Sequence, residues 1–301
     1  MPPSPRDMVS RAIYQEIKEG RGAGPNADWA YLDISHLDPR VIEEKLPDIT
    51  EFARIYLKVE PTKELVPIQP TAHYAMGGIP TDVDGRVVVG ADETIVPGLY
   101  AAGECACVSV HGANRLGTNS LLDIVVFGKR GGRHMAAYAA EADRPRAPAG
   151  AEKESAAEVD RLLRSSGSES VADIRDELQE HMFDLAGVVR TGEGLRSMQE
   201  RLGGLRERFG RAVVQDKGKV YNTDVMEAWE LGALLDCAET LVAAALARDE
   251  SRGGHYRDDH PLRDDANWLK HSLAYREEDG SVRLEYKPVK MGPYTPMERK
   301  Y

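Results

Sequence analysis

The sequence predicts an α+β fold in which mixed helices and strands come first, an antiparallel helical bundle follows and a small α/β tail ends the chain. Three observations support this order. A short apolar strand, a glycine-bearing loop and a long helical segment follow one another over residues 95–140. Amphipathic helical periodicity then recurs over residues 152–249. Two β-like stretches flank Gly280 in the tail.

Length, hydrophobic content and net charge indicate a globular protein. A chain of 301 residues with 42% hydrophobic content is long enough for one large or two ordinary globular domains. Acidic residues number 50 and basic residues 39, which gives a net charge of −11. Because phosphate binding needs a basic surface, this balance argues against nucleic acid as the main partner.

Cysteine spacing and hydropathy indicate the compartment. Cys105 and Cys107 are too close in sequence for an ordinary structural disulfide, so we expect small buried thiols in a reducing compartment. The longest apolar run, Leu121–Phe127, is interrupted by Asp123 and is far shorter than the ~18 residues of a membrane span. Residues 1–7 contain no apolar stretch, so no secretory signal is expected.

The first part of the chain is predicted to alternate helical and extended segments. A helix over residues 6–19 has apolar positions at Met8, Ile13 and Ile17, and the glycine-rich stretch 20–24 ends it. Expected after it are a strand at 29–34, a short helix at 39–46 and an extended segment at 65–74.

Residues 76–140 carry the clearest local signals. Asp84-Gly85 lies between two apolar stretches, which predicts a strand–turn–strand hairpin over residues 76–90. A short buried strand at 95–104 is expected next, then a polar loop at 105–119 and a long helix at 120–140.

The rest of the chain reads as helical. A Pro/Ala-rich boundary is expected at residues 144–150. Amphipathic helices are predicted at 152–166, 168–186, 192–210 and 223–249. In the last of them one apolar stripe is expected to face an antiparallel bundle, formed by Leu231, Leu234, Leu235, Ala238, Leu241, Val242 and Ala245.

One stretch is specific enough to indicate chemistry. The run HGANRLGTNSLLD, His111–Asp123, follows Gly98–Glu104, so a strand leads through a polar loop into a helix. Small residues let a ligand approach the backbone, and the free N–H groups of a helix N-terminus favour negative charge. Reduced flavin, phosphate or a carboxylate would fit there. An ordinary helix capped by Thr118, Asn119 or Ser120 is the alternative.

No metal site is predicted. His111 and His255 are candidate ligands by residue type, but the sequence has no paired C-x-x-C or H-E-x-x-H spacing.

The same run is similar, residue by residue, to the end of the flavin domain in the succinate dehydrogenase and fumarate reductase flavoprotein family. Further stretches resemble this family in order along the chain. They are Arg6–Arg11 for its cap-domain motif, Thr71–Ile79 for its substrate-histidine motif, Arg252–Asp258 for its helical-domain signature and Asn267–His271 for the start of its C-terminal domain.

The resemblance implies roles for individual residues. Contacts to FAD would come from Glu104, Ser120 and Leu121. His73 and Arg115 would hold a dicarboxylate, the first by a hydrogen bond or positive charge and the second by its planar guanidinium fork. Taken without the family, His73 could be a structural hydrogen bonder, and Arg115 could pair with a surface carboxylate.

Arg6 would shuttle the proton. A guanidinium with a pKa above ~12 is a poor general acid, but hydride transfer to fumarate leaves a carbanion basic enough to take a proton from arginine. Asp7 is a candidate helper, or else one half of a charge pair with Arg6 at the helix start.

The sequence also departs from the family. It contains no G-x-G-x-x-G segment for the flavin diphosphate, so we expect the C-terminal half of a flavoprotein subunit without the main FAD-binding part. The expected domains are the end of the cap domain, the end of the FAD-binding domain, a helical bundle and a tail, at residues 1–65, 66–142, 151–262 and 263–301.

The implied parent enzyme interconverts succinate and fumarate with FAD. It would pass electrons to an iron–sulfur subunit and dock through it on membrane-anchor subunits, as a peripheral protein at the cytoplasmic face of a bacterial membrane. The chain by itself is expected to be inactive. The alternatives are a fragment of an L-aspartate oxidase-like flavoenzyme, against which the long C-terminal tail argues, and a non-catalytic truncated or interaction chain.

Overall fold

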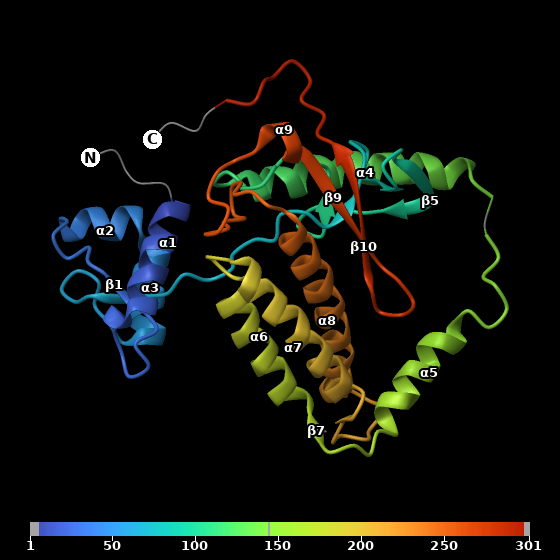
Figure 1. The fold of residues 1–301 in the computed structure, drawn as a ribbon, viewed down its shortest axis with the longest axis horizontal. Helices are drawn as coiled ribbons and strands as arrows, with labels where there is room; N and C mark the ends of the chain where they lie inside the picture. The colour runs from blue at the N-terminus through green and yellow to red at the C-terminus, as the bar shows by residue number, and fades with distance from the viewer. Residues whose placement is uncertain (1–5, 144, 298–301) are drawn as a thin grey trace. The chain divides into compact units, whose positions relative to one another are not determined.

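The computed structural model describes residues 6–143 and 145–297. The chain divides into two compact units, unit 1 ending at His73 and unit 2 beginning at Tyr74. Figure 1 traces the helices and strands of both. The domain limits predicted at residues 65, 142 and 262 stay predictions. Arg144, which opens the predicted Pro/Ala-rich boundary, lies outside the described residues.

Unit 1 holds short helices and one small sheet. Its elements are α1 (Arg6–Glu16), a π-helical turn (Ile17–Arg21), β1 (Ala30–Leu32), α2 (Pro39–Lys45), α3 (Pro47–Phe52), a second π-helical turn (Ala53–Leu57) and β2 (Val66–Ile68). The two strands pair antiparallel. Asp38 caps α2 by accepting the N–H of Arg40, and Pro39 opens the helix, as its fixed φ favours. The predicted helices and strands are confirmed, while α3 was not predicted.

Unit 2 begins with four strands and a long helix. They are β3 (Ile79–Pro80), β4 (Arg86–Val89), β5 (Thr94–Tyr100), β6 (Ala106–Cys107) and α4 (Asn119–Glu141). β4 pairs antiparallel with β5, and β3 pairs parallel with β6. The long helix predicted at 120–140 is confirmed.

One strand prediction in this region is confirmed and another is wrong. The strand–turn–strand predicted over residues 76–90 is confirmed. The N–H of Gly85 donates to the carbonyl of Asp82 in the turn, and the two sides are joined by the antiparallel bridge between Thr81 and Val87 and by a bond from the Asp82 N–H to the Arg86 carbonyl. Each of these strands also pairs with a later one, β3 with β6 and β4 with β5. β5, expected to be buried, is mostly exposed, since the described residues give it one neighbouring strand.

Four helices form the bundle and confirm the prediction. They are α5 (Glu152–Leu163), α6 (Val171–Ala186), α7 (Gly192–Phe209) and α8 (Thr223–Ala247). Ser170, Thr191 and Asn222 cap the last three by accepting backbone N–H groups. Two short parallel strands, β7 (Glu169–Ser170) and β8 (Ala212–Val213), lie at the helix ends.

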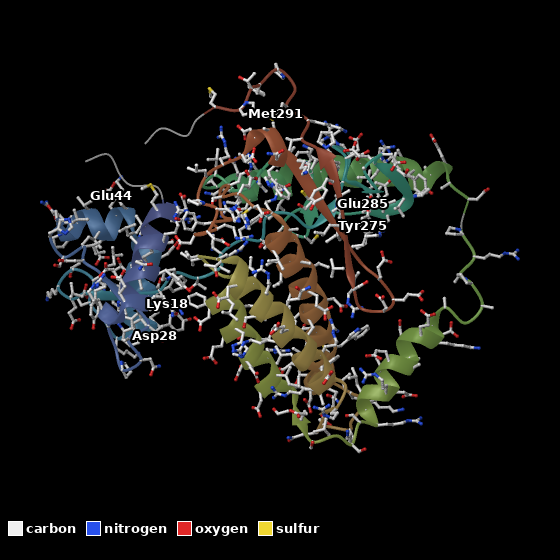
Figure 2. All side chains as sticks on the ribbon, in the orientation of Figure 1. Lys18, Asp28, Glu44, Tyr275, Glu285 and Met291 are labelled. Carbon is white, nitrogen blue, oxygen red and sulfur yellow. The ribbon has the colours of Figure 1, made fainter. Side chains whose placement is uncertain are left out.

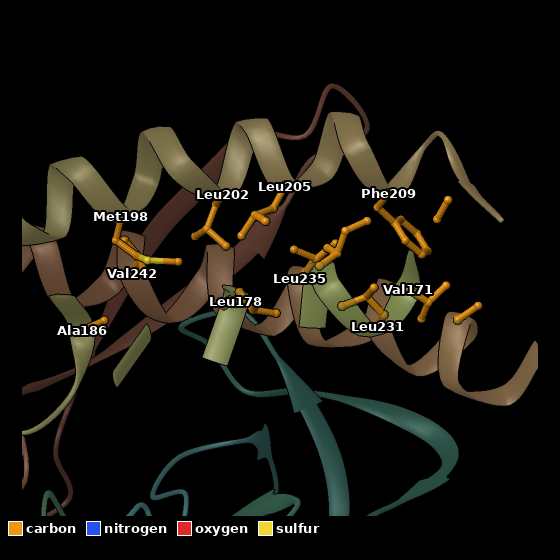
Figure 3. Close-up of a cluster of buried hydrophobic side chains, with 14 of the residues drawn as sticks. Val171, Leu178, Ala186, Met198, Leu202, Leu205, Phe209, Leu231, Leu235 and Val242 are labelled. Atoms are coloured by element: carbon orange, nitrogen blue, oxygen red, sulfur yellow. The ribbon is translucent and has the colours of Figure 1, made fainter. Parts of the chain in front are cut away.

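The core of unit 2 lies between α6, α7 and α8 (Figure 3). The stripe predicted on α8 needs one correction. Leu231, Leu235 and Val242 are fully buried, but Leu234 and Leu241 are each 43% exposed. The buried positions follow one another at three- and four-residue steps, and these two leucines fall beside that stripe.

The tail confirms the predicted pair of strands around Gly280. A short helix, α9 (Asp265–Trp268), leads into β9 (Lys270–Arg276) and β10 (Val282–Pro288), which pair antiparallel. Figure 2 labels Tyr275 and Glu285 on this hairpin, where the tyrosine hydroxyl donates to the carboxylate across 3.3 Å. Among the described residues, no helix is long and apolar enough to cross a membrane.

The expectation of small buried thiols is wrong. All three cysteines are free, Cys105 and Cys237 are exposed and Cys107 is partly exposed. Cys105 follows the turn at Gly103 and precedes β6, which keeps its side chain at the surface.

Candidate functional site

Helix α4 begins without a side-chain cap. Thr118 precedes it in the left-handed conformation with φ 65° and makes no capping hydrogen bond; its hydroxyl donates to the carbonyl of Gly117 instead. The first turn is closed by backbone bonds, from Asn119 to Leu116 and from Leu121 to Thr118. The positive end of the helix dipole therefore meets no capping side chain, unlike the ordinary capped helix that was the alternative.

The segment around the predicted substrate histidine lies beside the segment that ends β5. One oxygen of Glu104 accepts the backbone N–H of Ala75 at 2.9 Å. The N–H of Ile79 donates to the carbonyl of Cys105 at 2.9 Å, where β3 meets β6. Two motifs that are separate in sequence are thus joined next to the start of α4.

Arg115 is the one predicted site residue that is buried, with 8% exposure. Among the residues that the structure describes, one hydrogen bond holds its guanidinium, from Nη1 to the carbonyl of Leu116 at 3.1 Å. Its Cζ lies 4.7 Å from the centroid of the Tyr74 ring. Within the described residues no carboxylate pairs with Arg115 and its Nε has no hydrogen-bond partner. The alternative that Arg115 pairs with a surface carboxylate is therefore not seen among the described residues.

A polar cluster lies under that arginine. The hydroxyl of Tyr74 donates to Oδ2 of Asp123 across 3.3 Å, and Nε2 of His111 lies 2.9 Å from the same oxygen. The Tyr74 hydroxyl and His111 Nε2 are 3.2 Å apart, and their rings meet edge to face. Burial, and then the nearby Asp123 carboxylate, raise the pKa of Tyr74, so its hydroxyl stays a donor.

Sequence reasoning missed this cluster. Asp123 is a carboxylate inside the apolar run Leu121–Phe127, and it is only 4% exposed. A charge in such a run was the available signal, because buried carboxylates require partners. No signal identified Tyr74 and His111 as those partners, since they lie 49 and 12 residues away in sequence.

A turn after α8 supports the loop that carries Arg115. The N–H of Gly254 donates to the carbonyl of Ala113 at 2.8 Å. Arg252 anchors this turn through two hydrogen bonds to the fully buried carboxylate of Glu250 and one to Asp265. The loop is thereby fixed to the helical part of unit 2.

His255 of the same turn is partly buried and lies against a cation. Its Nδ1 lies 2.9 Å from Nη1 of Arg190, and its Nε2 lies 3.3 Å from the carbonyl of Arg248. Burial, and then the charge of Arg190, lower the pKa of His255 to about 4. Neutral His255 therefore accepts from the guanidinium and donates to the carbonyl.

The remaining predicted residues belong to different units. Arg6 opens α1 and is exposed, and His73 is the exposed last residue of unit 1. Asp7 was a candidate to assist proton transfer by Arg6. Its Oδ2 lies 3.1 Å from Nη2 of Arg11. Glu104, Ser120 and Leu121 lie in unit 2 with Arg115; Ser120 is half-buried and Leu121 is 66% exposed. The described residues hold no group of three or more metal-ligating side chains.

Comparison with known families identifies the class of protein. The model of an FAD binding domain matches residues 3–121, and a model described as the fumarate reductase flavoprotein C-terminal region matches residues 175–301. The first match contains Glu104, Arg115, Ser120 and Leu121, and the second contains most of the bundle and the tail. The chain therefore carries part of an FAD binding domain and a flavoprotein C-terminal region.

Related proteins agree on the family. The succinate dehydrogenase flavoprotein subunit of Rickettsia bellii is 46% identical over 292 residues, which are 94% of this chain and 48% of that protein. The fumarate reductase flavoprotein subunit of Mycobacterium tuberculosis is 43% identical over 305 residues, 99% of this chain and 51% of its own length. A structure of Escherichia coli quinol fumarate reductase superposes with a TM-score of 0.88 at 41% identity, covering 98% of this chain and 50% of that one.

This chain belongs to the succinate dehydrogenase and fumarate reductase flavoprotein family, whose members are FAD-dependent oxidoreductases. It spans about half the length of the curated relatives that it matches.

Proposed function

We propose that this chain supplies the dicarboxylate-binding part of an FAD-dependent oxidoreductase that interconverts succinate and fumarate. The observation that carries the proposal is Arg115, a buried guanidinium without a carboxylate partner among the described residues, placed just before the uncapped start of α4. A buried charge of this kind is stabilised by an anion. Two carboxylates on a short chain would supply that charge.

The start of α4 fits the flavin of FAD. Ser120 and Leu121 lie in its first turn, where the absence of a capping side chain leaves the dipole end to favour an acceptor edge. Glu104 binds Ala75 through one carboxylate oxygen, and the other would face a ligand hydroxyl or N–H group. When bound there, FAD would supply the hydride acceptor for succinate oxidation and the hydride donor for fumarate reduction.

The chain's own residues would manage the carboxylates and the proton. Arg115 would bind one carboxylate through its guanidinium fork, and His73 would donate a hydrogen bond to the other. A guanidinium N–H of Arg6 would give its proton to the carbon next to the one that receives the hydride, and would take it back during succinate oxidation. Succinate then loses one hydride and one proton in total, which balances its conversion to fumarate.

The relatives support the proposed partners. The solved relatives include a quinol fumarate reductase with menaquinol molecules and a Mycobacterium smegmatis Sdh1 complexed with UQ1. By extension, the flavoprotein containing this chain would pass electrons through an iron–sulfur subunit to a quinone at membrane-anchor subunits. It would lie peripherally on the cytoplasmic face of the bacterial membrane.

Co-expression tests the proposal. The chain is produced together with the N-terminal half of a homologous flavoprotein subunit, and succinate-dependent reduction of a dye is measured with malonate as inhibitor. We expect turnover that depends on both polypeptides and is inhibited by malonate. A flavin-loaded assembly that neither binds malonate nor oxidises succinate would contradict the proposed function.

A further inference from the structure

Hydrogen bonds alone do not fix the direction of the Arg115 side chain. One bond joins Nη1 to the neighbouring carbonyl of Leu116, and within the described residues Nε has no partner. The other contact is the face of Tyr74, whose centroid lies 4.7 Å from Cζ. A guanidinium at this distance is attracted by the ring quadrupole, and the attraction grows when the pair is removed from water. Arg115 is only 8% exposed, so this contact is a desolvated one.

The Tyr74 ring is in turn held from its hydroxyl end. Its hydroxyl donates to Asp123, which is 4% exposed and lies in the second turn of α4. His111 Nε2 reaches the same carboxylate oxygen at 2.9 Å and packs its ring edge to face against Tyr74 at 5.3 Å. A phenol that donates to a carboxylate carries more electron density in its ring, which strengthens its attraction for a cation. Asp123 therefore acts on Arg115 through Tyr74.

We propose that Tyr74 is a positioning residue for Arg115: its ring orients the guanidinium, while Asp123 and His111 fix the ring. This inference rests on the proposed function for its purpose, which is to hold the arginine fork ready for a carboxylate. Among the described residues the buried Nε has no hydrogen-bond partner, so the guanidinium keeps an unused donor. Preorganisation of this kind lowers the entropy lost when the anion binds.

Arginine side-chain NMR on the whole chain tests the positioning role without any ligand. The Nε–H signal of Arg115 is identified by its absence from the Arg115→Lys variant. We expect a slowly exchanging signal in the parent chain and in Tyr74→Phe, which keeps the ring. In Tyr74→Leu, exchange of this proton with water should speed up about tenfold or more.

Tyr100 provides the matched control. It is also partly buried, and its hydroxyl pairs with Nδ1 of His134 on α4 at 2.8 Å, but no contact joins it to Arg115 within the described residues. Tyr100→Leu should leave the Arg115 signal unchanged. An unchanged Arg115 signal in Tyr74→Leu would overturn the proposal. If that variant does not fold, the parent chain decides, because the absence of contacts between Tyr74 ring protons and Arg115 Hδ protons in NOE spectra would overturn it as well.

Malonate titration of the same variants, each co-expressed with the N-terminal half of a homologous flavoprotein subunit, separates this inference from the proposed function. We expect Tyr74→Leu to bind malonate about tenfold more weakly than the parent and Tyr74→Phe to recover most of the loss. If the parent binds no malonate while its Arg115 signal still depends on Tyr74, the positioning role is supported and the dicarboxylate function is not. If malonate binds equally to the parent and to Tyr74→Leu, the positioning role is wrong and the function stands.

Discussion

Gly254 donates its backbone N–H to the carbonyl oxygen of Ala113 across 2.8 Å, which ties the turn after α8 to the loop that carries Arg115. The neighbouring Gly253 has φ +61°, and a Cβ at this position would lie 2.3 Å from the same carbonyl oxygen. Only a glycine allows the two backbones to approach this closely.

Replacing Gly253 by alanine should therefore disturb the Arg115 loop. Gly280→Ala is a matched control, because Gly280 has φ +84° but a methyl group there would have its nearest neighbouring atom 3.7 Å away. We expect about 1 kcal/mol of lost stability in the control from backbone strain, and a larger loss with weaker malonate binding in Gly253→Ala. Urea unfolding and calorimetry measure the two effects. Equal losses in both variants would contradict the close-approach argument.

The two candidate site arginines should separate by their effects on turnover and binding. In the chain co-expressed with an N-terminal half, Arg6→Gln should abolish turnover but largely retain malonate affinity, because its proposed role is proton transfer. Arg115→Ala should weaken malonate binding by roughly 2–5 kcal/mol, since a buried charge pair is lost. His73→Ala should fall between them. Substantial turnover in Arg6→Gln, or parent-like malonate affinity in Arg115→Ala, would show that these roles are wrong.

The chain by itself should retain little FAD. Its sequence has no G-x-G-x-x-G segment, so the contacts that hold a flavin diphosphate at a helix N-terminus are not available from that motif. Purified protein should be nearly colourless. The measurement is the ratio of absorbance at about 350–500 nm, where flavin absorbs, to absorbance at about 280 nm, where protein absorbs. A yellow protein with stoichiometric flavin would disprove the expectation.

Acid should destabilise unit 2 through His255. The pKa of this histidine is lowered from 6.5 to about 4 in the folded chain, so the folded state binds fewer protons than the unfolded state between these values. Its stabilising effect is complete above pH 6.5 and is lost as the pH falls toward 4, by up to about 3 kcal/mol. The free energy of unfolding, measured by urea titration from pH 7 to 4.5, reports this loss.

His255→Gln should flatten that pH dependence, because an amide can accept from Arg190 and donate to a carbonyl without titrating. The slope should not vanish, since burial and then the charge of Lys287 also lower the pKa of His271. A His255→Gln variant with the parent's slope would rule out this histidine as the cause.

The bundle offers a packing test on one helix. Leu231 is fully buried on α8, whereas Leu234 one turn further along is 43% exposed. Leu231→Ala should cost about 2–5 kcal/mol of unfolding free energy, and Leu234→Ala less than about 1 kcal/mol. Circular dichroism during urea unfolding gives both values. Similar losses would mean that the buried stripe is not the one described.

Local sequence patterns predicted most of the helices. Helix α4 and the four bundle helices form where apolar periodicity indicated them, because this signal acts within a few residues. The strand partners were harder. The turn at Gly85 was predicted from Asp84-Gly85, but the ladder between β4 and β5 and the parallel pairing of β3 with β6 were not.

The residues of the candidate site were found by resemblance, whereas the contacts between them came from the structure. Motif resemblance supplied Glu104, Arg115, Ser120 and Leu121 as residues of one flavin-type segment, and these roles remain predictions. The structure added the contact between Arg115 and Tyr74 and the bond between Tyr74 and Asp123, which join residues 41 and 49 positions apart by the numbering of the chain. No periodicity encodes such pairs.

The sequence by itself therefore determined the helical elements, the family resemblance and the residue types available for binding a dicarboxylate. Tertiary structure decided which strands pair, which leucines of α8 are buried and which side chains surround Arg115. The physical reason is the range of the interactions. Helix periodicity and capping depend on neighbours within about four residues, whereas burial and the partners of a buried charge depend on segments that meet only when the chain has folded.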